Sequence, residues 1–418
     1  MKKGITTVTA PKLKSRPPVV VVVGHIDHGK STLLDYIRQT TMAKNEAGPP
    51  RREAGGITQR VSAYEVKHRG QDGEEKTITF LDTPGHAAFS SLRERSTKIA
   101  DLAIVVVSAE EGVKAQTLEA LTVVTSTGLP YLVAINKIDR PNSSVDRTKQ
   151  SLAENNILVE GYGGTIPWVA ISAKTGQGIT ELLELILLMA ELAELTTTPS
   201  AVAQGFILEA TRDPRVGIIT TLIIKNGTLQ SGDFLTTGTI IGRIKKLENF
   251  LGQPVDQLQA SSPAVVLGLP TMPEAGAVFV STKDKKTAET ITESISEILL
   301  NNSPTNNFAE GVTIIPLILK ADNVGSLEAL TKEVKKLGTE TVALSIINSS
   351  IGQITENDVK LGLGTSPALI VGFNIRVEKS ATELAEKHGV MIKTFDIIYH
   401  LSEWLTEEIT RRTPVSEV

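Results

Sequence analysis

Five consecutive valines, Val19 to Val23, run directly into a glycine-rich turn, and this junction constrains the fold more than any other segment. A strand that is apolar on both faces must be covered on both faces, which is typical of a central strand in a parallel α/β sheet. The turn matches the pattern G-x-x-x-x-G-K-[S/T] through Gly24, Gly29, Lys30 and Ser31, and the helix-like stretch STLLDYIRQT follows it. The junction therefore predicts a strand, a phosphate-binding turn and a helix in succession.

The same alternation of strand-like and helix-like segments continues to about residue 196. The apolar runs TITFLDT, LAIVVVSA, PYLVAIN and PWVAIS are separated by helix-like stretches or, after PYLVAIN, by a polar segment. This alternation predicts an α/β domain with a doubly wound, mostly parallel sheet over residues 17–196, behind a basic tail at 1–16. Its last helix places one apolar stripe toward the core, made of Ile179, Leu182, Leu183, Ile186 and Met189.

The pattern changes after the linker TTTPS at residues 196–200. Short strands punctuated by Asn226-Gly227, Ser231-Gly232 and Gly238 predict an antiparallel β-barrel over 201–284, with a hairpin at Asn226-Gly227. A helical connector at 285–310 follows. The alternation then returns and predicts a small α/β/α sandwich at 311–398, with a C-terminal helix running outward at 399–418.

Composition excludes several classes of protein. The 418 residues include no cysteine, so disulfides, zinc–thiolate sites and thiol catalysis are excluded, and the absence of cysteine fits a cytoplasmic protein. A formal net charge of −4 gives no global signal for nucleic acid, so any RNA contact must come from local patches. The longest apolar runs are far shorter than the roughly 20 residues that span a bilayer, so we expect no membrane partner.

The phosphate turn predicts a nucleotide site. Its glycines let successive backbone N–H groups point inward, and the following helix adds positive potential at its first turn. His28, Gly29 and Thr32 belong to this cradle, together with Lys30, which can bridge the β- and γ-phosphates, and Ser31, which can bind Mg²⁺.

Two further segments point to the same ligand. FLDTPGH, residues 80–86, brings Asp82 to the carboxyl end of a strand, where it can hold Mg²⁺. Gly85 offers an N–H to a γ-phosphate, and His86 then lies near the attacking water. The glycine-rich, polar stretch REAGGITQRVSAYEV, residues 52–66, reads as a mobile loop in which Thr58 completes the Mg²⁺ shell only when a γ-phosphate is present. These residues predict an order–disorder switch.

The segments NKID and SAK, each after a strand, predict the base. Asn136, Lys137 and Asp139 have the spacing to present complementary groups, and the Asp139 carboxylate can accept two hydrogen bonds from the N1–H and N2–H₂ groups of guanine. Adenine lacks this donor pair. The second segment consists of Ser172, Ala173 and Lys174, and its Ala173 N–H can meet the guanine O6. The four segments in this order predict a P-loop GTPase domain that binds GTP and GDP at the carboxyl ends of the strands.

At this point a resemblance becomes clear. GHIDHGKST, EAGGITQ, FLDTPGH, NKID and SAKTGQGI together resemble the translational GTPases, and EAGGITQRVSAYEV combined with FLDTPGHAAFSSLRERSTKIADLAIVVVSAEEGVKAQT is similar to the bacterial initiation-factor-two family. IPLILKADNVGSLEAL, IGQITENDVKLG, ALIVGFNIRV and HGVMIKTFDIIYHL resemble the third domain of that family. The resemblance covers residues 17–402.

The resemblance implies a GTP-hydrolysing initiation factor that promotes joining of the ribosomal subunits around initiator tRNA. It implies contact with both subunits, stimulation of hydrolysis by the ribosome with His86 positioning the water, and a monomeric factor. It also implies that Asp27 helps to hold a monovalent cation near the phosphates. The family has a long N-terminal region and two further domains after the outward helix, the last of which grips the formyl-methionyl end of initiator tRNA. This sequence stops at Val418, so we do not expect direct tRNA recognition by it.

Three alternatives remain open at this level. The chain can be a guanine-nucleotide-dependent ribosome-binding module that delivers no tRNA, a translational GTPase of the elongation type, or a metabolic P-loop enzyme. The NKID segment and the barrel directly after the GTPase domain argue against the last. GTP turnover measured with and without ribosomes distinguishes the first alternative from a GTP-hydrolysing initiation factor.

Overall fold

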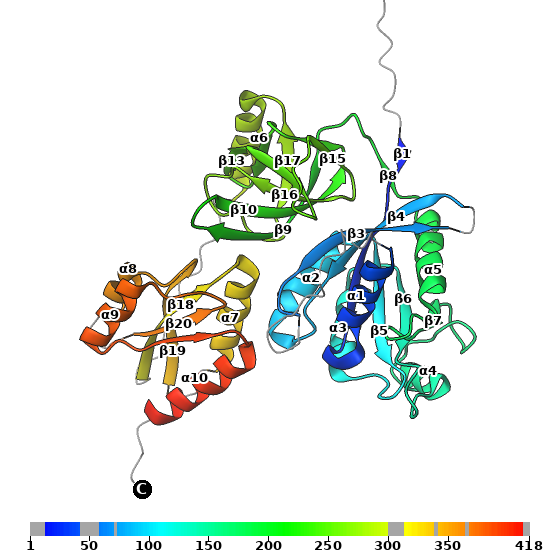
Figure 1. Cartoon of the computed structure of the whole chain (residues 1–418), viewed down its shortest axis with the longest axis horizontal. Coiled ribbons are helices and arrows are strands. Elements are labelled where there is room, and N and C mark those ends of the chain that lie inside the picture. Colours follow the sequence, from blue (N-terminus) through cyan, green and yellow to red (C-terminus); the bar gives the residue numbers. More distant parts are fainter. Residues whose placement is uncertain are drawn as a thin grey trace, which may run out of the picture.

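The computed structural model describes residues 13–41, 58–70, 73–299, 313–337, 342–363 and 368–412. It contains a first domain built on a six-stranded sheet, a β domain built on a seven-stranded sheet, and a third domain built on a four-stranded sheet. Figure 1 shows that the first domain borders both other domains, with β3 and α2 on the sides that face them.

The sheet of the first domain has the order β3-β4-β2-β5-β6-β7. All neighbouring strands are parallel except the edge pair β3–β4. Val19 to Val23 in the central strand β2 are at most 1 % exposed, because helices cover both faces of the sheet. The strands are β2 (Val19–Gly24), β3 (Ser62–Arg69), β4 (Glu75–Asp82), β5 (Leu102–Ser108), β6 (Tyr131–Asn136) and β7 (Trp168–Ala170).

Two layers of helices cover this sheet. One core contains side chains of α1 and α5, including the predicted stripe residues Ile179, Leu182, Leu183 and Ile186, and the other contains side chains of α2, α3 and α4. The helices are α1 (Lys30–Thr41), α2 (Ser90–Ile99), α3 (Ala115–Ser126), α4 (Val145–Glu154) and α5 (Ile179–Leu192), with short 3₁₀ turns η1 (Ile26–His28) and η3 (Ala87–Phe89). The predicted doubly wound, mostly parallel fold is confirmed.

Two local expectations need correction. The predicted mobile loop at 52–66 is wrong for its second half, because β3 begins at Ser62 and pairs antiparallel with β4; residues 52–57 lie outside the described part of the chain. The polar segment after β6 contains α4, whose Ser144 caps the helix by accepting a hydrogen bond from the Arg147 N–H. In both places the polar side chains of the segment hid a regular element.

The β domain is an antiparallel sheet in the order β13-β12-β17-β9-β10-β16-β14, with a separate pair β11–β15. The predicted antiparallel β domain is confirmed, although its sheet is curled and open, since the edge strands β13 and β14 do not pair with each other in the described residues. Helix α6 (Lys285–Leu299) packs on β12, β13 and β17. The strands are β9 (Gln204–Asp213), β10 (Gly217–Asn226), β11 (Thr228–Gln230), β12 (Phe234–Thr237), β13 (Ile240–Arg243), β14 (Lys246–Asn249), β15 (Gln257–Gln259), β16 (Pro263–Leu267) and β17 (Val278–Thr282).

The predicted hairpin at Asn226-Gly227 is wrong. β11, which follows this dipeptide, pairs with β15 and not with β10. Gly227 (φ 78°) approaches the linker so closely that a Cβ there would lie 2.3 Å from the Val202 carbonyl oxygen, and the Asn226 side chain accepts hydrogen bonds from Thr197 and Thr198. The dipeptide therefore anchors the linker. The predicted turn at Gly238 (φ 54°) does join paired strands, β12 and β13.

The third domain is a parallel sheet in the order β19-β18-β20-β21 between two helical layers. α7 and α10 lie on one face, and α8 and α9 on the other. The predicted α/β/α sandwich is confirmed. Its elements are β18 (Thr313–Ala321), α7 (Val324–Lys336), β19 (Val342–Ile351), α8 (Glu356–Leu361), β20 (Leu369–Phe373), α9 (Lys379–His388), β21 (Ile392–Phe395) and α10 (Ile398–Arg412).

The expected outward course of the last helix is wrong. Ile398, Leu401, Leu405 and Ile409 of α10 are at most 5 % exposed, because this stripe packs into the core of the third domain. Their spacing of three or four residues gives α10 an apolar stripe that only docking on the sheet can bury. No helix in the described ranges is long and apolar enough to cross a bilayer.

The β domain is joined to the first domain by a buried group of charges. β1 (Lys14–Ser15) pairs with β8 (Thr196–Thr197), and the next residue, Arg16, makes two hydrogen bonds of 2.6 and 2.7 Å to the Asp101 carboxylate. Lys225 of β10 approaches the same carboxylate at 2.6 Å. Burial alone would raise the pKa of Asp101, but the hydrogen bond from Arg16 and the charge of Lys225 lower it overall. We call this group the Asp101 joint.

The third domain contacts the first domain through different residues. Phe89 and Leu92 share one apolar core with residues of the third domain, and Gln59 Nε2 donates to the Asp396 carbonyl oxygen at 2.8 Å. Around this core lie three polar side-chain pairs: Arg60 with Asp322, Arg95 with Glu328, and Ser90 with Lys332. We call this contact the α7–α10 joint.

Candidate functional site

The phosphate turn begins where β2 ends, and its shape requires glycine at two positions. A Cβ on Gly24 (φ 142°) would lie 2.5 Å from the Val106 carbonyl oxygen. A Cβ on Gly29 (φ 84°) would lie 2.5 Å from the Asn136 side-chain nitrogen. Between them η1 curls the chain into the start of α1, so backbone N–H groups gather at a helix N-terminus, which is a ready anion site.

Lys30, the first residue of α1, lies across this turn. Its ammonium donates to the carbonyl oxygens of Gly24 at 2.9 Å and His25 at 2.7 Å. Burial lowers the pKa of Lys30 to about 8, with the negative charge of Asp82 opposing that shift. A Cβ on Gly85 would lie 2.7 Å from the Lys30 ammonium, so the FLDTPGH loop meets the turn here.

The other turn residues divide into buried and exposed ones. The His28 ring is buried, with Nδ1 3.2 Å from the Val106 carbonyl oxygen, and burial lowers its pKa to about 4. His28 is therefore neutral, and only its backbone faces the cradle. Asp27, Ser31 and Thr32 lie on the solvent side.

The three residues predicted to bind Mg²⁺ come together. Ser31 Oγ lies 2.8 Å from Thr58 Oγ1, and both line, with Asp82, a pocket of about 30 Å³. A volume of this order suits one water molecule or one small ion. The described ranges contain no group of three His, Asp or Glu side chains that could hold a metal ion, but Mg²⁺ needs none, since it usually takes one or two carboxylates plus water and phosphate oxygens. The donor set fits Mg²⁺.

Asn136 ties the segments NKID and SAK, which are predicted to bind the base, to the phosphate turn. Its side-chain nitrogen donates to the His28 carbonyl oxygen at 2.8 Å, and its oxygen accepts from the Ala173 N–H at 3.0 Å. Asn136 is 1 % exposed. The N–H that the sequence assigned to guanine O6 is therefore engaged by Asn136 in this state.

Asp139 lies at the solvent rim of the same region. One of its oxygens accepts from the Ser172 hydroxyl at 2.7 Å, and this hydrogen bond lowers the pKa of Asp139. Lys137 adopts positive φ (66°), and its ammonium lies 3.7 Å from Glu111. Lys174 is exposed beside them. The rim thus holds an exposed, ionised carboxylate.

His86 has a different environment from the rest of the site. Its Nδ1 accepts from the Ala88 N–H at 2.8 Å, and burial lowers its pKa. The neutral ring therefore carries its proton on Nε2, and this nitrogen is buried without a hydrogen-bond partner in the described residues. The ring lies against Phe89 and against Tyr399 of α10.

Sequence reasoning missed Arg93, which supports the His86 loop. The Arg93 guanidinium is buried, donates to the carbonyl oxygens of Pro84 at 3.2 Å and His86 at 2.5 Å, and pairs with Glu119 at 2.6 Å. A charged residue in a polar helix gives no periodicity signal. Only its place one helical turn inside α2, after a loop that must be held, could have suggested this role.

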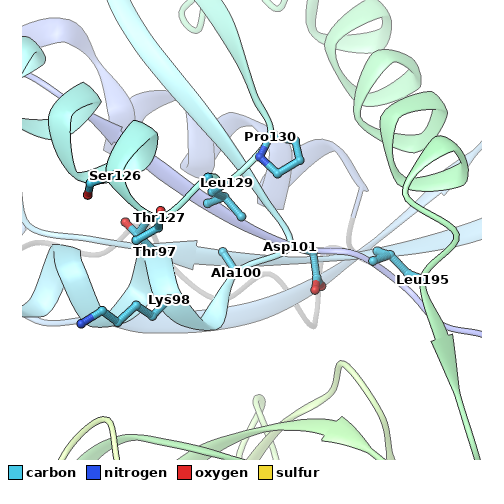
Figure 2. A pocket seen from close by; sticks show the side chains of 10 residues that line it. Thr97, Lys98, Ala100, Asp101, Ser126, Thr127, Leu129, Pro130 and Leu195 are labelled. Carbon is cyan, nitrogen blue, oxygen red and sulfur yellow. The ribbon is translucent and has the colours of Figure 1, made fainter.

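A second pocket lies away from the nucleotide segments. It has a volume of about 510 Å³ and lies at the amino ends of β5 and β6. Figure 2 shows Asp101 and Leu195 on one side of it and Leu129 and Pro130 on another. Because the carboxyl ends of β2, β4 and β6 carry the nucleotide segments, this pocket belongs to the side of the sheet where the Asp101 joint lies.

Comparison with known proteins divides the chain in the same way as the fold. The family model of the elongation factor Tu GTP-binding domain matches residues 15–191, that of elongation factor G domain 2 matches 202–282, and that of translation-initiation factor 2 matches 285–406. The chain belongs to the translation initiation factor 2 family. It is similar to translation initiation factor IF-2 of Persephonella marina (44 % identical, 95 % of this chain, 45 % of that protein) and of Rubrobacter xylanophilus (39 % identical, 94 % and 56 %).

A solved structure supports this relationship. GDP-bound aIF5B from Aeropyrum pernix is 28 % identical, with a TM-score of 0.54, over 95 % of this chain and 75 % of that one. The chain spans about half the length of the curated family members that it matches. The similarity therefore includes all three described domains.

Proposed function

We propose that this chain binds GTP and GDP with Mg²⁺, hydrolyses GTP, and acts as a translation initiation factor on both ribosomal subunits. It acts as a cytoplasmic monomer during subunit joining with initiator tRNA. One observation carries the proposal: Asn136 joins the phosphate turn to the SAK segment, so the phosphate cradle and the base rim lie side by side at the carboxyl ends of the strands.

The residues of the cradle have separable roles in nucleotide binding. The backbone N–H groups of residues 27–32 and the Lys30 ammonium hold the β- and γ-phosphates, once Lys30 leaves the two carbonyl oxygens that it now contacts. Ser31, Thr58 and Asp82 would hold Mg²⁺, which would neutralise charge on the phosphate oxygens. Gly85 donates its N–H to the γ-phosphate. Asp27 helps to hold a monovalent cation near the phosphates.

Base selection depends on Asp139. Ser172 occupies one lone pair of the carboxylate, and the others accept the N1–H and N2–H₂ of guanine. Lys137 lays its aliphatic stem on the purine ring, while Asn136 and Ala173 keep the SAK segment in place.

In hydrolysis a water oxygen bonds to the γ-phosphorus and the bond to the β-phosphate oxygen breaks, which releases GDP and phosphate. His86, neutral and with its proton on Nε2, orients this water when its loop brings the ring to the γ-phosphate. Arg93 holds the backbone of that loop through the Pro84 and His86 carbonyl oxygens.

GTP turnover with and without ribosomes tests the proposal. His86→Ala should keep the affinity for a fluorescent GTP analogue, while ribosome-stimulated turnover falls about 10²- to 10⁴-fold, the usual contribution of one positioned group. An equal loss of nucleotide binding would show that His86 is structural. Nucleotide binding by the unmodified chain without any turnover on ribosomes would instead indicate a binding module.

Asp139→Asn tests whether Asp139 selects guanine. The asparagine amide oxygen can still accept from N1–H, which both bases carry, but its NH₂ group repels the N2–H₂ of guanine and can donate to the C2 carbonyl of xanthine, so GTP affinity should fall about 10- to 100-fold and xanthosine triphosphate should bind better. Competition titrations of the two nucleotides measure this. Unchanged preference would remove Asp139 from the site.

A further inference from the structure

The ring of His86 lies in the α7–α10 joint rather than in the phosphate cradle. The charged groups that act on its imidazole are Glu333 and Lys336 of α7, Arg93 of α2 and Glu119 of α3. Its backbone carbonyl is fixed by Arg93 and its Nδ1 by the Ala88 N–H. What covers the ring decides whether it can reach the nucleotide.

Tyr399 covers it. The centroids of the two rings are 4.1 Å apart with an angle of 59° between the planes. Tyr399 is 44 % exposed, so one part of its ring contacts His86 while another faces solvent. Its hydroxyl is near enough to Asp27 of the phosphate turn and Glu333 of α7 for their negative charge to act on it, so this ring of the third domain faces the phosphate turn.

Tyr399 cannot move independently of the third domain. Its neighbour Ile398, and Leu401 and Leu405 further along α10, are completely buried in the core that includes α7 and β18. The His86 loop, by contrast, belongs to the first domain and is held there by Arg93. The ring contact therefore links the position of the third domain to the position of His86.

We propose that Tyr399 is a positioning residue that holds the His86 ring on the third domain in the resting state, and that withdrawal of α10 releases it to the nucleotide. This inference rests on the proposed GTPase function. The buried, unpaired Nε2–H favours release, because it gains a hydrogen-bond partner when the ring leaves the joint. The solvent-facing part of Tyr399 gives a ribosomal surface a place from which to move it.

Chemical reactivity of the unmodified chain gives the first test. Diethylpyrocarbonate modifies accessible imidazoles, and peptide mass spectrometry gives a rate for each of the six histidines. His86 should react at least about tenfold more slowly than His400, the exposed neighbour of Tyr399. Equal rates for His86 and His400 would overturn the inference without any substitution.

Substitution of Tyr399 gives the second test. Tyr399→Ala should bring the reactivity of His86 close to that of an exposed histidine and raise ribosome-free GTP turnover about three- to tenfold, the factor that corresponds to one lost aromatic contact. His400→Ala is the matched control, since it removes an exposed ring from the same helix, and it should change neither quantity. Tyr399→Phe retains the ring and should keep His86 protected from the reagent.

The outcomes separate this inference from the proposed function. If ribosomes stimulate the unmodified chain and His86→Ala abolishes that stimulation, the proposed function stands. If Tyr399→Ala then leaves both the reactivity of His86 and ribosome-free turnover unchanged, the inference alone fails. Deprotection of His86 by Tyr399→Phe as strongly as by Tyr399→Ala would also overturn it, because the hydroxyl and not the ring would then hold His86.

Discussion

The two joints of the first domain differ in chemistry and in place. The Asp101 joint is a carboxylate held by a bidentate arginine and a lysine, with Arg16 and Asp101 side chains 9 % and 8 % exposed. The α7–α10 joint combines an apolar core with partly exposed pairs, such as Arg60, which is 50 % exposed, with Asp322. The first joint lies at the amino ends of the strands, and the second is built from residues next to the nucleotide segments.

This difference predicts that the third domain separates from the first domain more easily than the β domain does. A buried charge left without its partner is very unfavourable, so the Asp101 joint opposes separation of the β domain. Exposed ion pairs contribute little, so the pairs around the α7–α10 joint oppose separation of the third domain only weakly. Thr58 and Gly85, which are proposed to bind Mg²⁺ and the γ-phosphate, are followed within a few residues by Gln59, Arg60 and Phe89 of the α7–α10 joint. The third domain is thus placed to respond to the nucleotide.

The largest effect is expected at the Asp101 joint. Asp101→Ala leaves Arg16 and Lys225 buried without a counter-charge, so the free energy of unfolding of the first domain should fall by about 3–5 kcal/mol. Urea unfolding followed by fluorescence measures this. The sequence has two tryptophans, so Trp404→Phe leaves Trp168 of β7 as the reporter of the first domain.

Asp146→Ala in α4 is the control for that experiment. It makes the same chemical change in a pair with Lys149, where the Asp146 side chain is 92 % exposed and the Lys149 side chain 16 %, and should cost at most about 0.5–1 kcal/mol. Similar losses for the two variants would mean that the Asp101 joint is no stronger than a surface pair.

An intermediate effect is expected from pH, and it concerns the phosphate turn between the joints. The pKa of His28 is lowered to about 4 in the folded chain, so between pH 6.5 and 4 the unfolded state binds the extra proton. The free energy of unfolding that the neutral, buried His28 contributes is therefore fully present above pH 6.5. It is lost as the pH falls toward 4, by about 3 kcal/mol in total. Urea unfolding of the Trp404→Phe chain at a series of pH values measures it.

His28→Gln provides the comparison, because glutamine does not titrate in this range. The variant should show a shallower loss of stability between pH 6.5 and 4 than the parent chain. Parallel pH profiles for the two chains would contradict the assignment of this loss to His28.

The smallest effect is expected at the α7–α10 joint. Arg60→Ala removes the pair with Asp322, and because Arg60 is half exposed, the coupling energy of the two residues should be below about 1 kcal/mol and should decrease with added salt. A double-mutant cycle of Arg60→Ala and Asp322→Ala measures it, in a Trp168→Phe chain so that Trp404 alone reports unfolding. A salt-independent coupling of several kcal/mol would make the two joints equivalent and remove the basis of the comparison.

Much of the fold follows from the sequence because burial on two faces leaves a strong pattern. Val19 to Val23 and the stripe on α5 are determined by this physics, and both lie in the core as expected. The errors occur where a polar surface hides an element, as in α4 and β3, or where a turn signal is used for another purpose, as at Asn226-Gly227. Local signals do not show which distant strand pairs with which.

The candidate site is likewise predictable only where local sequence signals determine it. Motif spacing predicts Lys30, Ser31 and Asp82 as site residues, because binding of phosphate and Mg²⁺ requires particular groups at particular places along the chain. It does not give Arg93 or Tyr399, because their roles depend on contacts between α2, α10 and the His86 loop that only tertiary packing creates. Nor does it show that the Asn136 side chain joins the His28 carbonyl oxygen to the Ala173 N–H.

The bridge made by Asn136 also sets an order of events during synthesis of the chain. Its two hydrogen bonds join residue 28 to residue 173, which are separated by most of the first domain. A nascent chain that has exposed β2 and α1 but not the SAK segment lacks one end of this bridge. The newborn protein should therefore become able to retain guanine nucleotide only after Ala173 has left the exit tunnel.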